Sequence, residues 1–216
     1  MMAEKINSFY DKMSATYDKW MESGESTLED ELSLVLKTFP NPCRILDVGC
    51  GTGRISLPLQ ELGYTIVGVD ISQGMINQAR SKGLAESYVS DFASFQYDQN
   101  SFDGVISLHA GFSYTQDNRI MERMIQKCHG LLVHEGIVLW DSPNSQFYGR
   151  ERKLEWPTDN GTVETICYGH DIKELIELFE KSGFEIQNVW GSYTPLKEHE
   201  EGLPRLIIDA KKHSEK

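Results

Sequence analysis

The chain has 216 residues, enough for one domain with a sizeable core. It carries 21 Lys and Arg against 33 Asp and Glu, which gives a formal net charge of −12. An acidic surface repels phosphate backbones and anionic membranes, so nucleic-acid and membrane partners are disfavoured. No apolar run approaches the roughly 20 residues that span a bilayer, and the first residues lack the apolar part of a signal peptide. We therefore expect a cytoplasmic protein.

The four cysteines are scattered along the chain without C-x-x-C spacing, at Cys43, Cys50, Cys128 and Cys167. This pattern argues against a zinc site and against a disulfide framework. We expect reduced thiols and no metal centre.

Residues 1–40 stand apart from the rest as two expected helices. Apolar and aromatic residues recur at helical spacing from Tyr10 to Met21, which predicts the first helix. Residues 27–30 match a capping signal that opens a second helix, and Pro40 ends it. The aromatic residues of this segment fit either a lid over a ligand or plain core.

A strand that runs into three alternate glycines is the strongest signal in the sequence. Residues 45–48 are apolar, and Gly49, Gly51 and Gly53 follow them. Glycine lets the backbone turn sharply and brings its N–H groups close to a ligand. A second strand over 64–70 then ends in an acid 21 residues after Gly49, close to the ~20 at which a ribose-binding acid is expected. The two features together predict a nucleotide-binding turn.

Strands and helices alternate through the remainder of the chain, which implies a parallel, doubly wound sheet. Further strands are expected up to 89–92, over 101–107, within 131–139, over 184–190 and over 205–210. Helices are expected from 55, from 72, from 120 and from 171. Residues 144–170 have no strong helical period and are interpreted as a loop or short hairpin over the active site.

The glycine turn reads G-C-G-T-G-R, so its third glycine comes one residue earlier than in the dinucleotide fingerprint G-x-G-x-x-G. With Asp47 before it and Asp70 after the second strand, the pattern resembles the first motif of class I S-adenosylmethionine-dependent methyltransferases. The resemblance runs over most of the chain. One departure is that residues 134–136 read His-Glu-Gly where the family usually has Pro-Gly-Gly.

The resemblance implies an α/β fold with a seven-stranded, mostly parallel, Rossmann-like sheet whose last strand is antiparallel. Residues 41–216 would form this methyltransferase domain, and residues 1–40 would form an N-terminal helical lid. Residues 144–170 would be the insert on the acceptor side. The implied cofactor is S-adenosyl-L-methionine, with S-adenosyl-L-homocysteine as the product.

The resemblance also implies a set of cofactor-binding residues: Tyr17, Asp47, Gly49, Cys50, Gly51, Gly53, Asp70, Ile71, Met75, Asp91, Phe92 and Leu108. Asp70 would take the ribose hydroxyls, and Asp91 would accept from the adenine amino group. A plainer interpretation makes Asp70 a cap for the next helix and Asp91 an ordinary turn residue. Asp47 fits anchoring of the loop as well as contact with the sulfonium, and Cys50 fits a small residue in a tight place.

His109 is the candidate catalytic residue because it follows the fourth strand, where the crevice should open. An imidazole that titrates near neutrality can take a proton from an oxygen or nitrogen acceptor. A hydrogen-bonded structural histidine is the alternative, and the sequence leaves both open. Polar and aromatic residues of the insert, and Arg205 near the last strand, fit the surface as well as an acceptor pocket; those of the insert are Arg150, Arg152, Trp156, Tyr168 and His170.

The sequence therefore predicts an enzyme that moves a methyl group from S-adenosylmethionine to a small-molecule oxygen or nitrogen acceptor, as a monomer or homodimer. A protein side chain or a quinone-like ring is an alternative acceptor. Two other classes stay open: a nicotinamide-dependent oxidoreductase, which the early third glycine disfavours, and a non-catalytic module that binds the same cofactor.

Overall fold

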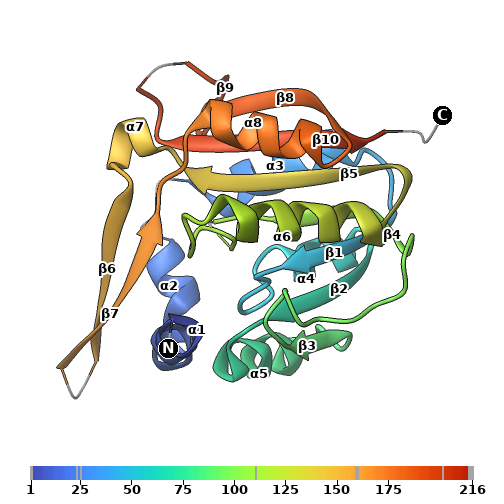
Figure 1. Cartoon of the computed structure of the whole chain (residues 1–216). Helices are drawn as coiled ribbons and strands as arrows, with labels where there is room; N and C mark the ends of the chain where they lie inside the picture. The colour runs from blue at the N-terminus through green and yellow to red at the C-terminus, as the bar shows by residue number, and fades with distance from the viewer. Residues whose placement is uncertain are drawn as a thin grey trace.

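A single large sheet organises the chain (Figure 1). The computed structural model describes residues 2–22, 24, 26–109, 111–158, 161–200 and 202–213. Within these residues eight strands pair in the order β3-β2-β1-β4-β5-β10-β8-β9. The strands are β1 (Arg44–Val48), β2 (Thr65–Asp70), β3 (Ser87–Val89), β4 (Phe102–Ser107), β5 (Leu132–Pro143), β8 (Phe184–Tyr193), β9 (Leu196–Glu198) and β10 (Arg205–Lys212).

The sheet is mostly parallel, and its last long strand is antiparallel to both neighbours. β1 pairs in parallel with β2 and β4, whereas β10 runs antiparallel to β5 and to β8. This confirms the predicted fold class. The sheet has one strand more than predicted, the short β9, which pairs antiparallel with β8. Strand order reverses between β1 and β4, so the carboxyl ends of these strands border the crevice where doubly wound sheets bind ligands.

Helices cover both faces of the sheet (Figure 1). They are α1 (Met2–Met13), α2 (Tyr17–Met21), α3 (Leu28–Thr38), α4 (Ser56–Glu61), α5 (Gln73–Ser81), α6 (Asn118–Leu131), α7 (Ser145–Tyr148) and α8 (Ile172–Lys181). Met121 of α6 and Phe179 of α8 belong to the core on one face. Leu34 of α3, Leu59 of α4 and Ile76 of α5 belong to the core on the other face.

Side-chain caps fix where several helices begin. Thr27 and Asp30 form a capping box at α3, and the Ser72 hydroxyl accepts from the Met75 N–H at α5. Asp171 accepts from two backbone N–H groups at the start of α8. Each cap satisfies donors that the first helical turn leaves without a partner. These three helix starts are confirmed.

The N-terminal segment differs from the prediction because its first helix is broken. α1 ends at Met13 and α2 begins at Tyr17. Between them the Ser14 hydroxyl donates to the Asp11 carbonyl at 2.9 Å, and the Thr16 hydroxyl donates to the Met13 carbonyl at 3.2 Å. Hydroxyl side chains that bond the backbone locally compete with the helical ladder. The periodicity of the aromatic residues does not reveal this competition.

The segment between β5 and α8 forms a hairpin that stands apart from the large sheet (Figure 1). After α7, β6 (Glu151–Thr158) pairs antiparallel with β7 (Gly161–Tyr168). Leu154, Trp156 and Val163 of this hairpin pack against the buried Phe9 and Met13 of α1. The tip, including Asn160, lies outside the described residues.

Residues 134–136 lie within β5, at a register shift in its pairing with β4. Glu135, with φ of 64°, takes the left-handed conformation. Gly136 fits for another reason, because a Cβ there would lie 3.0 Å from Leu132 Cδ2. The glycine is therefore explained by close packing.

Aromatic packing between α8 and the sheet generates a stability prediction. Phe179 is fully buried, and its ring lies edge-on to Trp140 and Phe184 at centroid distances of 5.5 and 5.6 Å. We expect Phe179→Ala to lower the free energy of unfolding by about 3–5 kcal/mol, because it leaves a cavity in a close-packed core. Urea denaturation followed by circular dichroism measures this loss. Phe147→Ala is the control, since Phe147 is 53% exposed; equal losses for both variants would contradict the packing argument.

Candidate functional site

A cavity of about 260 Å³ opens at the carboxyl ends of β1, β2 and β4. Most of the predicted site residues line it: Tyr17, Gly49, Gly51, Asp70, Ile71, Met75, Asp91, Phe92, Leu108 and His109. We call it the first cavity. Its lining brings together segments separated by more than a hundred positions in the sequence.

Three predicted residues lie outside this lining. Asp47 is buried and accepts a hydrogen bond of 2.6 Å from Ser56 Oγ at the start of α4, so it anchors the glycine turn. Burial raises the pKa of Asp47 to about 7. The Cys50 side chain packs beneath Gly68, where a Cβ would lie 2.8 Å from its sulfur, and burial raises the pKa of its thiol. A Cβ on Gly53 would meet Leu57 at 3.2 Å, away from the cavity.

Several residues of the first cavity were not predicted as ligand-binding. Ile120 and Met124 of α6 line it, although their spacing in the sequence indicates only a helix. The core face of α6 is formed by Met121 and Ile125, which are fully buried. Apolar period alone does not distinguish a core face from a ligand face. Ile6, Phe112 and Tyr114 also line the cavity, as does Tyr10, for which the sequence leaves a lid over a ligand open.

Two glycines keep the cavity open at the turn. Gly49 has φ of 77°, and a Cβ there would lie 3.2 Å from the Gly111 backbone. Gly51 has φ of 54°, and a Cβ there would enter the space between Tyr17 and Met75, at 3.8 and 4.0 Å. L-residues rarely adopt such angles, so glycine is required at both places.

Asp70 is held at the end of β2 by backbone donors from two sides. Its Oδ2 accepts from the Gly51 N–H at 3.0 Å, and its Oδ1 accepts from the Ser72 N–H at 2.8 Å. Burial outweighs these hydrogen bonds and raises the pKa of Asp70 to about 6. Each carboxylate oxygen has further accepting capacity. The group can therefore also take hydroxyl donors in the cavity.

The N-terminal helices are fastened to this half of the site. Asp11 Oδ1 of α1 accepts from Ser72 Oγ at 2.6 Å and from the Gly74 N–H at 2.8 Å. Asp18 of α2 accepts from the hydroxyl of Thr52 in the glycine turn and pairs with Lys82. These contacts hold Tyr17 over the glycine turn.

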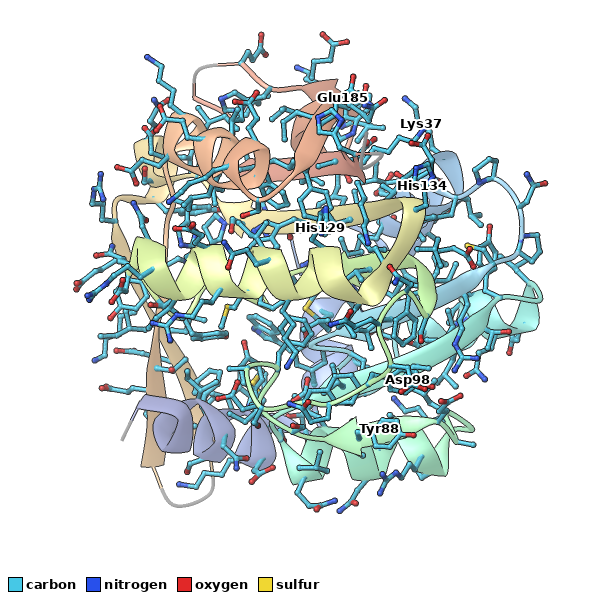
Figure 2. All side chains as sticks on the ribbon, turned by 45° about the vertical axis from the view of Figure 1, so that its right-hand side comes forward. Lys37, Tyr88, Asp98, His129, His134 and Glu185 are labelled. Carbon is cyan, nitrogen blue, oxygen red and sulfur yellow. The ribbon has the colours of Figure 1, made fainter. Side chains whose placement is uncertain are left out.

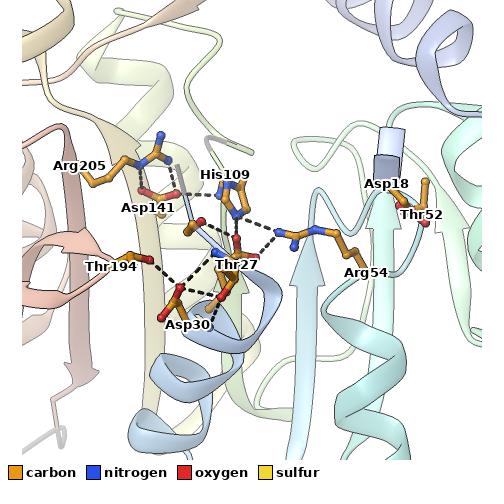
Figure 3. A network of polar contacts seen from close by, with 11 residues as sticks. Asp18, Thr27, Asp30, Thr52, Arg54, His109, Asp141, Thr194 and Arg205 are labelled. Carbon is orange, nitrogen blue, oxygen red and sulfur yellow. Dashed lines mark hydrogen bonds and ion pairs between the residues drawn. The ribbon is translucent and has the colours of Figure 1, made fainter. Parts of the chain in front are cut away.

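A buried polar network fixes His109 (Figure 3). Glu31 of α3 is fully buried and accepts from Arg54, from Ser26 Oγ at 2.6 Å, and from His109 Nε2 at 2.7 Å. Burial alone would raise the pKa of Glu31, but His109 and Arg54 outweigh it, and the net effect lowers the pKa. Glu31 is therefore an ionised carboxylate at the centre of the network.

The Glu31 contact determines which ring nitrogen of His109 can accept a proton. A carboxylate only accepts, so Nε2 carries the hydrogen and donates it to Glu31. Arg54 Nη2 lies 3.1 Å from the same nitrogen, and its own hydrogen bond goes to the other oxygen of Glu31. In the neutral ring the lone pair then resides on Nδ1, for which the described residues offer no partner. Nδ1 is therefore the ring nitrogen that can accept a hydrogen bond.

A second buried acid holds the backbone of His109 (Figure 3). Asp141 of β5 accepts the His109 N–H at 2.7 Å and also binds Arg205 through both of its oxygens. His109 has φ of 54°, an angle that costs energy outside glycine. The bond to Asp141 and a ring stack on Tyr193, with centroids 5.6 Å apart, stabilise this conformation.

His109 also borders a second cavity, of about 540 Å³. The second cavity lies among α2, the hairpin strand β6, and the ends of β8 and β10, and its lining includes Trp20, Met21, Arg152, Tyr193 and Arg205. Within the part of the chain that the structure describes, His109 is the residue common to both cavities.

Three further residues of the predicted insert, His170, Arg150 and Tyr168, make contacts within the fold and line neither cavity. His170 donates from Nε2 to the Thr115 carbonyl at 3.0 Å and accepts at Nδ1 from Ser142 Oγ at 3.1 Å. Burial lowers its pKa. Arg150 pairs with Glu174 at the surface. Tyr168 donates its backbone N–H to the Ser113 carbonyl at 2.7 Å, which ties β7 to the loop after β4.

No group of three or more His, Cys, Asp or Glu side chains suited to a metal ion occurs among the described residues. Likewise, none of the helices in the described ranges combines the length and apolar character needed to cross a bilayer.

The sheet order, together with the glycine turn whose Gly51 N–H donates to Asp70, defines a doubly wound α/β protein of the nucleotide-binding type. A family model described as a methyltransferase domain matches residues 45–136. A Bacillus mycoides (strain KBAB4) protein, named as an uncharacterized methyltransferase, is 30% identical over 86% of this chain and 92% of its own length. The chain belongs to the class I S-adenosylmethionine-dependent methyltransferases.

Solved structures share the fold. The CcbJ methyltransferase of Streptomyces caelestis has a TM-score of 0.80 at 14% identity, over 95% of this chain and 98% of its own. The 1,6-didemethyltoxoflavin-N1-methyltransferase of Burkholderia thailandensis, solved with 1,6-didemethyltoxoflavin and S-adenosylhomocysteine bound, has a TM-score of 0.71 at 17% identity, over 98% of this chain and 89% of its own.

The Glu31 network generates a second prediction. Glu31→Gln leaves the Arg54 guanidinium, 12% exposed, beside a neutral amide. We expect the free energy of unfolding to fall by about 3–5 kcal/mol, because a buried charge loses its partner. Because pairing lowers the pKa of Glu31, its stabilising effect is present above the ordinary glutamate pKa of about 4.3 and is lost as pH falls below it.

Chemical denaturation at neutral and acidic pH measures both effects. Glu29→Gln is the matched control, since Glu29 is an exposed acid of the same helix. If the two variants unfolded at the same denaturant concentration at neutral pH, the network would not contribute as argued.

Proposed function

We propose that this methyltransferase transfers the methyl group of S-adenosylmethionine to an oxygen or nitrogen atom of a small molecule. The cofactor would occupy the first cavity, the acceptor would occupy the second, and His109 would take the acceptor's proton. The observation that carries the proposal is that His109 borders both cavities.

The residues of the first cavity fit the cofactor. The space kept open at Gly51, next to Tyr17, suits the methionine and ribose portions, and the remaining capacity of Asp70 suits the ribose hydroxyls. Asp91 and Phe92 would border the adenine, and the Phe92 ring lies tilted against Phe112 at 5.2 Å between centroids. S-adenosylmethionine supplies a methyl group on a positively charged sulfur and leaves as S-adenosylhomocysteine.

Positioning contributes most to such a displacement, because the sulfonium already carries a good leaving group. The acceptor atom forms its bond to the methyl carbon as the carbon–sulfur bond breaks, and the electron pair stays on sulfur. The acceptor's proton passes to His109 Nδ1. Glu31, which receives the Nε2 hydrogen at 2.7 Å, stabilises the imidazolium that forms.

A small acceptor is supported by the second cavity of about 540 Å³ and by the acidic balance of the chain, with net charge −12, which disfavours nucleic acid. The Burkholderia thailandensis neighbour holds a small ring compound. We take the acceptor of this chain to be a metabolite as well.

Asp70 tests the cofactor half of the proposal. Asp70→Asn should weaken S-adenosylhomocysteine binding by about 1–3 kcal/mol, because the amide replaces an acceptor of two buried hydroxyls. Wild-type affinity should also fall as pH drops through about 6, where the buried carboxylate gains a proton, and the variant should lack this fall. Isothermal titration calorimetry at several pH values measures both. Asp98→Asn, at the exposed position labelled in Figure 2, is the control; unchanged affinity in Asp70→Asn would remove Asp70 from the site.

His109 tests the catalytic half. His109→Gln keeps an N–H donor for Glu31 but removes the base, so turnover should fall about 100-fold or more while S-adenosylhomocysteine affinity stays within about twofold. Transfer of labelled methyl groups to a metabolite panel finds an acceptor, and its rates with the two proteins are then compared. An unchanged rate in His109→Gln would contradict the role of His109 as the base.

A further inference from the structure

The second cavity carries positive charge in an otherwise acidic protein. Arg152 and Arg205 line it, and within the described residues no Asp or Glu side chain does. The whole chain has a net charge of −12. A net negative charge repels anions on average, whereas the cations of this cavity attract them.

The two arginines differ in how their charge is balanced. Arg205 binds both oxygens of the buried Asp141, so the pair contributes no net charge. Arg152 has no acidic partner in the described part of the chain, and its guanidinium lies 4.3 Å from the centroid of the Tyr148 ring. Stacking on a ring orients a guanidinium without using its N–H donors. Arg152 thus presents a fixed, uncompensated cation.

Part of the remaining lining suits an apolar body, beside the hydroxyl side chains of Ser26, Ser192 and Thr194. Trp20 and Met21 come from α2, and Pro204 comes from the segment before β10. Trp20 is 42% exposed, and its ring lies edge-on to Trp156 of the hairpin at 5.6 Å between centroids. A large exposed aromatic residue at the rim of a cavity is suited to contact with a ligand ring. His109 lies on the same cavity as this aromatic rim and the Arg152 cation.

We propose that the second cavity selects an anionic acceptor, a small molecule with an apolar body whose carboxylate or phosphate binds Arg152 while its reacting O–H or N–H faces His109. The inference rests on the proposed function, because it assigns the acceptor class of the same site. A guanidinium matches both anions with paired N–H donors, so both belong to this class.

Four ring compounds distinguish the chemistry when titrated by calorimetry into the protein saturated with S-adenosylhomocysteine. 4-Hydroxybenzoate and phenyl phosphate carry the two anions, 4-hydroxybenzamide is neutral, and tyramine is cationic. We expect one or both anionic probes to bind at millimolar concentration, with weakening at high salt. The neutral and cationic probes should bind at least about tenfold more weakly. The anion that binds more tightly identifies the natural headgroup.

Arg152→Gln should weaken the binding of the anionic probes about tenfold, because a charge-assisted hydrogen bond is lost. Lys153→Gln is the matched control. Lys153 is the next residue of β6, so its side chain lies on the opposite face of the hairpin, where it pairs with Glu155 at 2.8 Å and Glu164 at 2.5 Å. It should leave probe affinity unchanged.

The outcomes separate this inference from the proposed function. Both variants should keep wild-type affinity for S-adenosylhomocysteine, since neither residue lines the first cavity. Failure of the wild-type protein to bind S-adenosylhomocysteine would overturn the proposed function. If the wild-type protein binds S-adenosylhomocysteine normally, three results would overturn only the anionic acceptor. They are no binding of either anionic probe, equally tight binding of the amide or the amine, and equal effects of the two variants on probe affinity.

Discussion

The site depends on one buried carboxylate that must be neutralised. Glu31 has no exposed surface, and burying a charge is costly unless partners surround it. Its partners come from the glycine turn through Arg54 and from the loop after β4 through His109. The requirement to satisfy one acid therefore brings α3, the turn after β1 and the loop after β4 to a single point. The contact between Glu31 and His109 also fixes the tautomer of His109, with the ring hydrogen on Nε2.

Much of the fold and part of the candidate site could be predicted because their signals are local. Three glycines after an apolar strand and Asp70 at the end of the next strand identify the turn from short stretches of sequence. Glu31 gives no such signal, because it follows Glu29 and Asp30 in the first turn of a helix, where acids are usually exposed. Its burial follows from long-range packing, which the local sequence does not encode.

Apolar patterns were ambiguous for a related reason. Ile120 and Met124 show helical spacing, yet they line the first cavity, and Met121 and Ile125 fill the core. A ligand face and a core face are both apolar, so composition cannot separate them. The second cavity could not be predicted from the sequence either. Its residues come largely from α2, β6, β8 and β10, and only the fold brings these elements together.

The contacts of Asp11 bear on how such enzymes diversify. This side chain of α1 accepts from Ser72 Oγ and the Gly74 N–H, at the very start of the helix that follows Asp70. The N-terminal segment is therefore bonded to the start of α5, beside the first cavity. Grafting a foreign leader onto this scaffold to recruit a new acceptor would also strip two polar groups of their shared partner. The hairpin packs against the same helix, α1, and belongs to one apolar cluster with Met75, which lines the first cavity. A change in the packed residues of the hairpin would therefore reach that cavity as well.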